Sequence, residues 1–201
     1  MELTKERNFF SITKYALMVL IGSLLLILSA KIQTPFIPVP ATMQTFAVLL
    51  LGICFGYKVA CWSVVIYLIE GALGLPVFAA GGGLIYLQGP TSGYLFGFIL
   101  GALVSGFFKY DSDPIINFFK LIFSVSFIYI CGLAWLWANL NYYSDNSISF
   151  HQVFEKGAKP FLIIETYKIL ILCILSKQFF KVGNAADFFK DLSFSICPED
   201  S

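Results

Sequence analysis

Charged residues are scarce in this sequence. Lys, Arg, Asp and Glu make up 12% of its 201 residues, and 58% of the residues are hydrophobic. A soluble domain carries roughly 25% charged residues. Half that share cannot cover the surface of a soluble protein of this size, so the apolar surface needs lipid around it. The composition excludes an ordinary soluble domain and predicts a multi-pass protein of the cell membrane, surrounded by the lipid bilayer.

The sequence also lacks the residue sets that several other functions need. Histidine occurs once, as His151 in a polar stretch, so no set of metal ligands is apparent. The five cysteines include no Cys-x-x-Cys pair, which favours a packing role for them. There is no P-loop and no nucleophile elbow, and the net charge of +1 comes without a basic cluster. We therefore expect no metal, no cofactor, no catalytic residue and no nucleic-acid partner.

Apolar sequence is abundant and falls into six runs. A helix needs about 20 residues to cross the hydrocarbon core, and the second and fourth runs are shorter than that. The pattern predicts an all-α integral membrane protein, a bundle of six transmembrane helices that forms a single domain over residues 1–201. Residues 183–201 are expected to form a short cytoplasmic tail that is partly disordered. The six runs cover about residues 13–30, 43–55, 59–78, 94–108, 115–140 and 161–180.

Prolines, glycines and threonines mark the boundaries of these runs. The prolines within residues 35–40 end the first helix, because proline lacks an N–H group and restricts the residue before it. Thr42 or Thr45 is expected to cap the second helix, and Gly74 is expected to help break the third. Residues 141–159 form the longest polar loop.

The basic residues favour one orientation in the membrane. With the N-terminus inside, the 13 Lys and Arg residues divide into nine cytoplasmic, three external and one, Lys168, within the last helix. Both termini are therefore predicted to be cytoplasmic. The basic N-terminus and the apolar run after it also loosely resemble a signal peptide, but five more runs follow. The three external residues are Lys31, Lys156 and Lys159.

Two opposite charges, Glu165 and Lys168, lie inside the last run. Ionisable residues within a membrane helix are costly and usually face the bundle interior or a water-filled cavity. Their spacing of three places both on one face of the helix. A carboxylate accepts hydrogen bonds from N–H groups, and an ammonium donates to a carbonyl, so the pair suits a cyclic urea. The alternative interpretation is a plain ion pair within the helix.

Further candidates lie near the predicted external side. Glu70 is expected at the rim of a pocket, or as a carboxylate that reaches interfacial water. Gly81, Gly82 and Gly83, with Thr91 at the start of a helix, are expected to offer free N–H groups and a hydroxyl to a ligand carboxylate. A plain loop explains the glycines equally well.

Aromatic residues are dense, with 22 Phe, 10 Tyr and 3 Trp. Most are expected to contact lipid or to lie at the membrane interface. Phe36, Tyr86 and Tyr94 are expected near the glycine-rich loop and are candidates for the walls of an apolar pocket, although a structural role is favoured for each. Gln88, which follows the glycine-rich stretch, completes the candidate binding set.

Four stretches in order along the chain carry a resemblance to a known family. They are TPFIPVPATMQT at 34–45, GALGLPVFAAGGG at 71–83, GPTSGYLFGF at 89–98 and KPFLIIETYKIL at 159–170. These stretches resemble the BioY-type biotin-specific S components of energy-coupling factor transporters. The glycine-rich stretch resembles the family segment GAxGLPVFAxGxGG, and the stretch in the last run resembles PFxPGDxxKxxL. Together the four tie the first run to the last and are highly specific.

The resemblance implies a six-helix bundle with a biotin pocket near the outer face. It implies that Glu165 takes the place of the family's ligand-binding aspartate, that Lys168 matches the family's lysine, and that both contact the ureido ring. It also implies partners, namely a transmembrane coupling subunit and two ATPase subunits that alone use ATP. The chain departs from the family where Ile163, Ile164 and Glu165 replace Pro-Gly-Asp, and where Ser92 replaces a glycine.

Other functions remain open on the sequence alone. The chain could be an S component for another vitamin, or a biotin facilitator that works without an ATPase module. An intramembrane enzyme that uses Glu70, Glu165 and Lys168 would need a reactive centre, and no His, Ser or Cys set is placed to complete one. A membrane scaffold would bind no ligand at all.

Overall fold

The computed structural model describes residues 2–34, 38–110, 113–143 and 148–181, and these ranges are mainly helical. The predicted tail at 183–201 and Phe36 lie outside them. Two short strands pair antiparallel, β1 (Gln33–Thr34) with β2 (Ala41–Thr42). The helices are α1 (Glu2–Lys31), α2 (Gln44–Ala72), α3 (Ser92–Phe107), α4 (Pro114–Tyr143), α5 (Phe150–Gly157) and α6 (Leu162–Lys181), with short 3-10 helices η1 (Tyr86–Gln88) and η2 (Lys159–Phe161).

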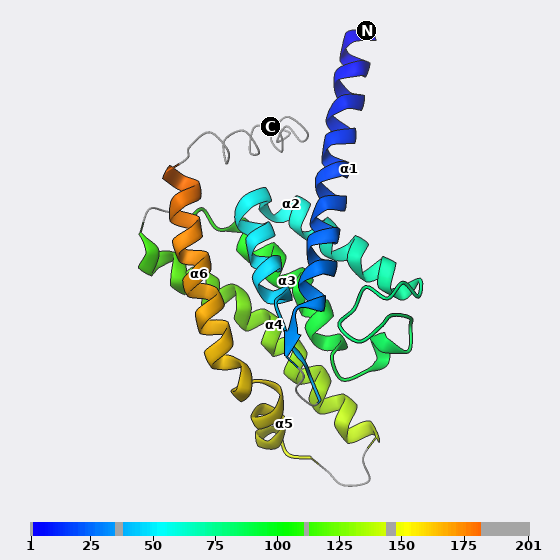
Figure 1. The fold of residues 1–201 in the computed structure, drawn as a ribbon, viewed down its shortest axis with the longest axis vertical. Coiled ribbons are helices and arrows are strands. Elements are labelled where there is room, and N and C mark those ends of the chain that lie inside the picture. The colour runs from blue at the N-terminus through cyan, green and yellow to red at the C-terminus, as the bar shows by residue number, and fades with distance from the viewer. Residues whose placement is uncertain (1, 35–37, 111–112, 144–147, 182–201) are drawn as a thin grey trace.

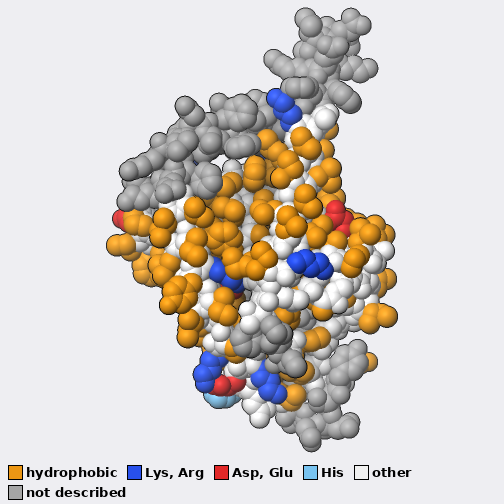
Figure 2. All heavy atoms as spheres, viewed as in Figure 1, with side chains coloured by type: hydrophobic (Ala, Val, Ile, Leu, Met, Phe, Trp, Pro, Cys, Tyr) orange, Lys and Arg blue, Asp and Glu red, His pale blue; other side chains and the backbone are white. Residues whose placement is uncertain are grey.

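The described helices have the length and the surface of a membrane protein. Three apolar segments are long enough to cross a bilayer, namely Ile12–Lys31, Gln44–Ala72 and Pro114–Tyr142. Large apolar side chains such as Leu24 and Phe119 are exposed on the outside of the bundle. Figure 2 shows apolar side chains over most of one face, with few charged groups among them. The prediction of an all-helical membrane protein is confirmed.

Helix α2 combines two of the predicted runs. Gly56 interrupts it with a φ of 74° and a ψ of 173°, a conformation that glycine adopts without a steric penalty. The predicted gap between the second and third runs therefore appears as a sharp kink (Figure 1). The break expected at Gly74 is confirmed, because α2 ends at Ala72 and Gly74 follows with a φ of 95°. The helix therefore ends before the third apolar run does.

Small residues bring α3 close to α4. A Cβ atom on Gly97 would lie 2.9 Å from the carbonyl oxygen of Ile128, and one on Gly93 would clash with Cβ of Trp135. Such small residues let the backbones of two membrane helices approach closely. Helix α2 packs against α1 and α3, and α6 packs against α4 and α2. These contacts place the start of α6 beside the start of α2.

The polar stretch at 141–159 is not a simple loop, because it contains α5. The Ser149 side chain accepts a hydrogen bond from the backbone N–H of Gln152, and the Gln152 side chain accepts one from the backbone N–H of Ser149. This reciprocal capping box is readable as Ser-x-x-Gln, so the sequence carried a signal for the helix. In Figure 1, α5 lies at the end of the molecule opposite the start of α1.

Candidate functional site

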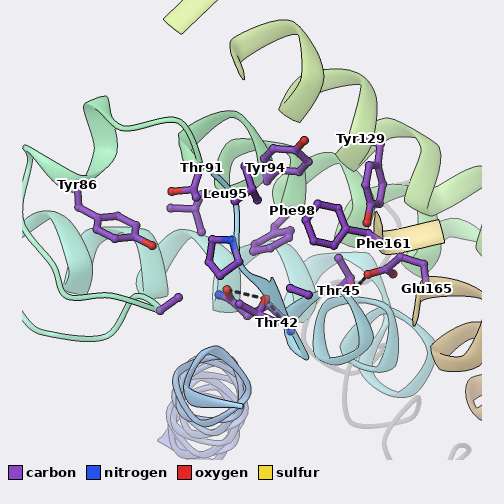
Figure 3. A pocket seen from close by; sticks show the side chains of 15 residues that line it. Thr42, Thr45, Tyr86, Thr91, Tyr94, Leu95, Phe98, Tyr129, Phe161 and Glu165 are labelled. Atoms are coloured by element: carbon purple, nitrogen blue, oxygen red, sulfur yellow. Dashed lines mark hydrogen bonds between the residues drawn. The ribbon is translucent and has the colours of Figure 1, made fainter. Parts of the chain in front are cut away.

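A pocket lies where the hairpin formed by β1 and β2 converges with α2, α3, α4 and the start of α6 (Figure 3). Its cavity volume is about 50 Å³. A single water needs roughly 10–15 Å³ on this measure, so the cavity has room for a few waters. A larger ligand therefore requires the walls to move. The lining residues are Val39, Pro40, Ala41, Thr42, Gln44, Thr45, Ala79, Tyr86, Thr91, Tyr94, Leu95, Phe98, Tyr129, Phe161 and Glu165.

One end of the pocket holds a buried charge pair. Glu165 is 7% exposed and Lys168 is 4% exposed, and the Lys168 Nζ lies 2.6 Å from Oε1 of Glu165. Both come from the first two turns of α6, so their spacing of three residues brings them together on the inner face. Neither charge is solvated by bulk water, and each therefore depends on the other and on nearby polar groups.

Hydrogen-bond acceptors in β2 and at the start of α2 complete the surroundings of Lys168. Its ammonium group donates to the carbonyl oxygen of Thr42 at 2.7 Å and to Oγ1 of Thr45 at 2.9 Å. With the bond to Glu165, all three N–H groups of the ammonium have protein acceptors. In this state, Lys168 has no N–H group left for a ligand carbonyl.

The two oxygens of the Glu165 carboxylate have different surroundings. Oε1 accepts hydrogen bonds from Lys168 and from the hydroxyl of Thr45, which lies 2.9 Å away. Oε2 is buried and accepts no hydrogen bond from any residue that the structure describes. The Tyr129 side chain from α4 points toward this carboxylate (Figure 3). A buried carboxylate oxygen without a partner is costly, so Oε2 is the group that a ligand donor would satisfy.

The opposite end of the pocket is polar but neutral. Tyr86 and Thr91 line it, and the Tyr86 hydroxyl points toward the centre of the pocket (Figure 3). Thr42 donates its hydroxyl to Oε1 of Gln44 at 3.1 Å, and Nε2 of Gln44 donates to the Tyr67 hydroxyl at 2.7 Å. Between the two ends, the walls are aromatic and aliphatic. The lining thus offers hydroxyl and amide groups and an apolar middle section.

The structure brings part of the predicted set together. Tyr86, Thr91, Tyr94 and Glu165 line the pocket, and Lys168 adjoins it through its bonds to Glu165 and Thr45. Tyr94 contributes its ring, because its hydroxyl donates to the carbonyl oxygen of Gly157 at 2.8 Å, away from the pocket.

The three consecutive glycines of the glycine-rich stretch, Gly81, Gly82 and Gly83, do not line the pocket. The N–H group of Gly81 donates to Phe78, and that of Gly83 donates to Gly71 at 2.7 Å. The expectation that this loop offers free N–H groups is therefore wrong for both residues. Gly82 lies against the Leu75 carbonyl, where a Cβ atom would clash. The loop closes onto the end of α2.

Two other predicted residues lie elsewhere in the structure. Gln88 borders a second cavity of about 280 Å³, together with Trp135, Asn139 and Tyr142. Glu70 accepts a hydrogen bond of 2.5 Å from the hydroxyl of Ser23, which ties α2 to α1. Neither residue lines the pocket that contains Glu165.

Sequence reasoning missed Thr45 and Tyr129 as parts of this site. Thr45 is expected from the sequence as a helix cap, but α2 has Met43 as its N-cap and the Thr45 hydroxyl turns toward α6. Thr45 and Glu165 are 120 residues apart in the sequence, so no local sequence pattern predicts their contact. Tyr129 is one of many aromatic residues in α4, and only the packing of α4 against α6 selects it.

These features define a class of protein: a helical membrane protein with an internal pocket and a buried, hydrogen-bonded charge pair at its wall. Such intramembrane charges mark sites and pathways for polar solutes. Residues 3–185 match the BioY family model, and the chain belongs to the BioY family.

Related proteins and a solved structure support this membership. The chain is 33% identical over 160 residues to the biotin transporter BioY of Thermotoga maritima, which covers 79% of this chain and 90% of that protein. It is 31% identical over 150 residues to the probable biotin transporter BioY of Pyrococcus horikoshii, covering 74% and 85%. The crystal structure of an S-component for biotin from an ECF-type ABC transporter shares the fold, with a TM-score of 0.65, 24% identity, and coverage of 88% of this chain and 93% of that one.

Proposed function

We propose that this chain is a biotin transporter, the membrane-embedded S component that captures biotin from outside and delivers it with an energising module. The observation that carries this proposal is the buried Oε2 of Glu165, which accepts no hydrogen bond from the described residues and lies beside a fully bonded ammonium group. A ligand that donates an N–H group satisfies this oxygen. Relatives that are named biotin transporters favour the ureido ring of biotin as that donor.

Binding of the ring involves both members of the pair. The Oε2 atom of Glu165 accepts one ureido N–H, and the ureido carbonyl requires a donor. Lys168 supplies that donor when it gives up its bond to the Thr42 carbonyl, which belongs to the hairpin beside the pocket. The exchange keeps three hydrogen bonds on the ammonium group and releases the Thr42 carbonyl from Lys168, so it couples the hairpin to the ligand. The small cavity agrees with a movement of this wall on binding.

The valeryl chain and the carboxylate of biotin contact the remaining residues that line the pocket. The valeryl chain lies along Tyr94, Leu95 and Phe98, whose apolar surface favours methylene groups. The carboxylate meets the hydroxyl groups of Tyr86 and Thr91 at the neutral end. This end of the described pocket contains no Lys or Arg, so neutral donors hold the carboxylate.

The membrane arrangement is part of the same proposal. Counting the two arms of α2 on either side of Gly56 separately, with α1, α3, α4 and α6, gives six membrane segments. The start of α1 and the end of α6 lie toward the same end of the molecule, which supports an even number of crossings with both ends cytoplasmic (Figure 1). The hairpin and α5 then lie on the external side, near the pocket.

Active uptake needs energy from other subunits, because no P-loop occurs in the sequence. The crystal structure that shares the fold is that of an S-component for biotin from an ECF-type ABC transporter. We therefore place this chain with a transmembrane coupling subunit and two ATPase subunits. The chain supplies the binding site, and the partners supply the work of transport.

Biotin binding to the purified chain in detergent, measured by isothermal titration calorimetry, tests this function. The Glu165→Gln variant keeps the shape of the side chain but loses the negative charge that accepts the ureido N–H. A hydrogen bond to a charged group contributes roughly 1.5–3 kcal/mol, so we expect the Kd to rise by about 10- to 100-fold. Absence of biotin binding by the wild-type chain would contradict the proposed function.

Glu155 provides a matched control. It forms an ion pair with Lys159 at 2.7 Å, but this pair lies at α5 and the turn that follows it and is largely exposed. The hydrogen bond from Lys159 holds the pKa of Glu155 below its usual value, so this carboxylate is charged at neutral pH. We expect Glu155→Gln to bind biotin with the wild-type Kd. A similar loss in both variants would show that the effect does not arise at the pocket.

A further inference from the structure

The Thr45 hydroxyl forms hydrogen bonds with both members of the buried charge pair. It donates to Oε1 of Glu165 and accepts from Nζ of Lys168, each at 2.9 Å. The third side of this triangle is the 2.6 Å contact between Lys168 and Glu165. Thr45 itself is 8% exposed, and it reaches the pair from α2 whereas both charges belong to α6.

The direction of these bonds is fixed by chemistry. An ammonium group only donates and a carboxylate only accepts, so the hydroxyl must accept from Lys168 and point its own hydrogen at Glu165. A hydroxyl can do both at once, and a methyl group can do neither. Threonine at this position therefore connects the two charges in a way that a residue of the same shape without the oxygen cannot.

The consequence is an asymmetric carboxylate. Two donors from different helices, Lys168 and Thr45, hold Oε1, which fixes the rotation of the Glu165 head group. Oε2 is left without a bond among the described residues. Loss of the Thr45 hydroxyl removes one of the two restraints and leaves an N–H group of Lys168 without an acceptor. The carboxylate can then turn, and Lys168 can compete for Oε2.

We infer that Thr45 is a positioning residue for ligand binding, which holds the Glu165 carboxylate so that Oε2 is presented to a ligand N–H group. This inference rests on the proposed function, because it assumes that Glu165 accepts a hydrogen bond from the ureido ring. It assigns no ligand contact to Thr45. Thr45 acts through the orientation of Glu165 and through the bonds of Lys168.

The test compares Thr45→Val, which keeps the shape and loses the hydroxyl, with Thr45→Ser, which keeps the hydroxyl and loses a methyl group. Biotin Kd is measured for both in detergent by titration calorimetry, with apo thermal unfolding measured in parallel. We expect Thr45→Val to raise the Kd by roughly 10- to 100-fold, the size of one hydrogen bond to a charged group. Thr45→Ser should stay within about threefold of wild type.

Thr166 provides the matched control for the valine substitution. It follows Glu165 directly in α6, but its side chain is exposed and its hydroxyl donates to the Leu162 carbonyl. Thr166→Val should therefore keep the wild-type Kd. Equal Kd values for wild type and Thr45→Val, or a Thr45→Ser variant as weak as Thr45→Val, would overturn the inference.

A double-mutant cycle separates positioning from simple packing. If Thr45 acts through the Glu165 carboxylate, adding Thr45→Val to Glu165→Gln should raise the Kd by no more than about twofold further. Fully additive losses would overturn the inference. If the wild-type chain fails to bind biotin, the proposed function fails instead, so the two failures are distinguishable.

Discussion

At the scale of single residues, the two charges of α6 could be paired from the sequence, but their partners could not. Charge, spacing and the cost of intramembrane charges predicted that Glu165 and Lys168 face inward together. The structure adds that Lys168 has all its N–H groups bonded and that one oxygen of Glu165 has no partner among the described residues. The bonds that link α6 to β2 and to the start of α2 join residues more than 100 positions apart, and periodicity carries no information about such contacts.

The buried pair makes a prediction for stability. Removal of one member of a buried ion pair leaves an uncompensated charge, which costs roughly 3–5 kcal/mol. We therefore expect Lys168→Met to lower the thermal unfolding temperature of the purified chain in detergent. The double variant Lys168→Met with Glu165→Gln removes both charges and should recover most of the loss, although it should not bind biotin tightly. A double variant that is no more stable than Lys168→Met would argue against a mutually compensating pair.

At the scale of elements, breaks and contacts in the chain position the site. The close approach of α3 to α4 brings together the pocket-lining residues of these two helices, and the kink at Gly56 divides α2 into two arms. The sequence showed the break as a gap between two apolar runs. The prediction of a polar loop over residues 141–159 overlooked α5, although the Ser-x-x-Gln pattern of its capping box is present in the sequence. The sequence held no sign of the hairpin, because strands of two residues are too short for an alternating pattern. The glycine-rich loop illustrates the opposite error, since its composition suggested free N–H groups that the fold uses internally.

The contact between α3 and α4 can be tested at Gly97. A leucine at this position places its Cβ 2.9 Å from the carbonyl oxygen of Ile128. This is a backbone atom, which cannot rotate away as a side chain can. Overpacking of this kind costs typically about 1–3 kcal/mol, so Gly97→Leu should unfold at a lower temperature than wild type. Leu100→Phe enlarges an exposed side chain on the same helix and should leave the unfolding temperature unchanged. Equal stability of both variants would contradict the close packing.

At the scale of the whole molecule, the exterior is apolar, whereas a buried charge pair and polar groups lie at an internal pocket. Exposed apolar side chains on α1 and α4 suit contact with lipid or with other membrane helices. The pocket carries its charge at one end only, and neutral hydroxyl groups line the other. The sequence contained both facts in outline, as an excess of apolar residues and a single arginine, Arg7, far from the pocket residues in the chain. The sequence alone did not reveal that segments far apart in the chain converge on one cavity.

A structure of the purified chain with biotin bound tests the central claim most directly. We expect the ureido ring at the α6 end of the pocket, with a ring N–H within hydrogen-bond distance of Oε2 of Glu165. The ring carbonyl should accept an N–H from Lys168 in place of the Thr42 carbonyl. A ring seated away from both residues, or Glu165 and Lys168 still bonded only to protein groups with biotin present, would contradict the account.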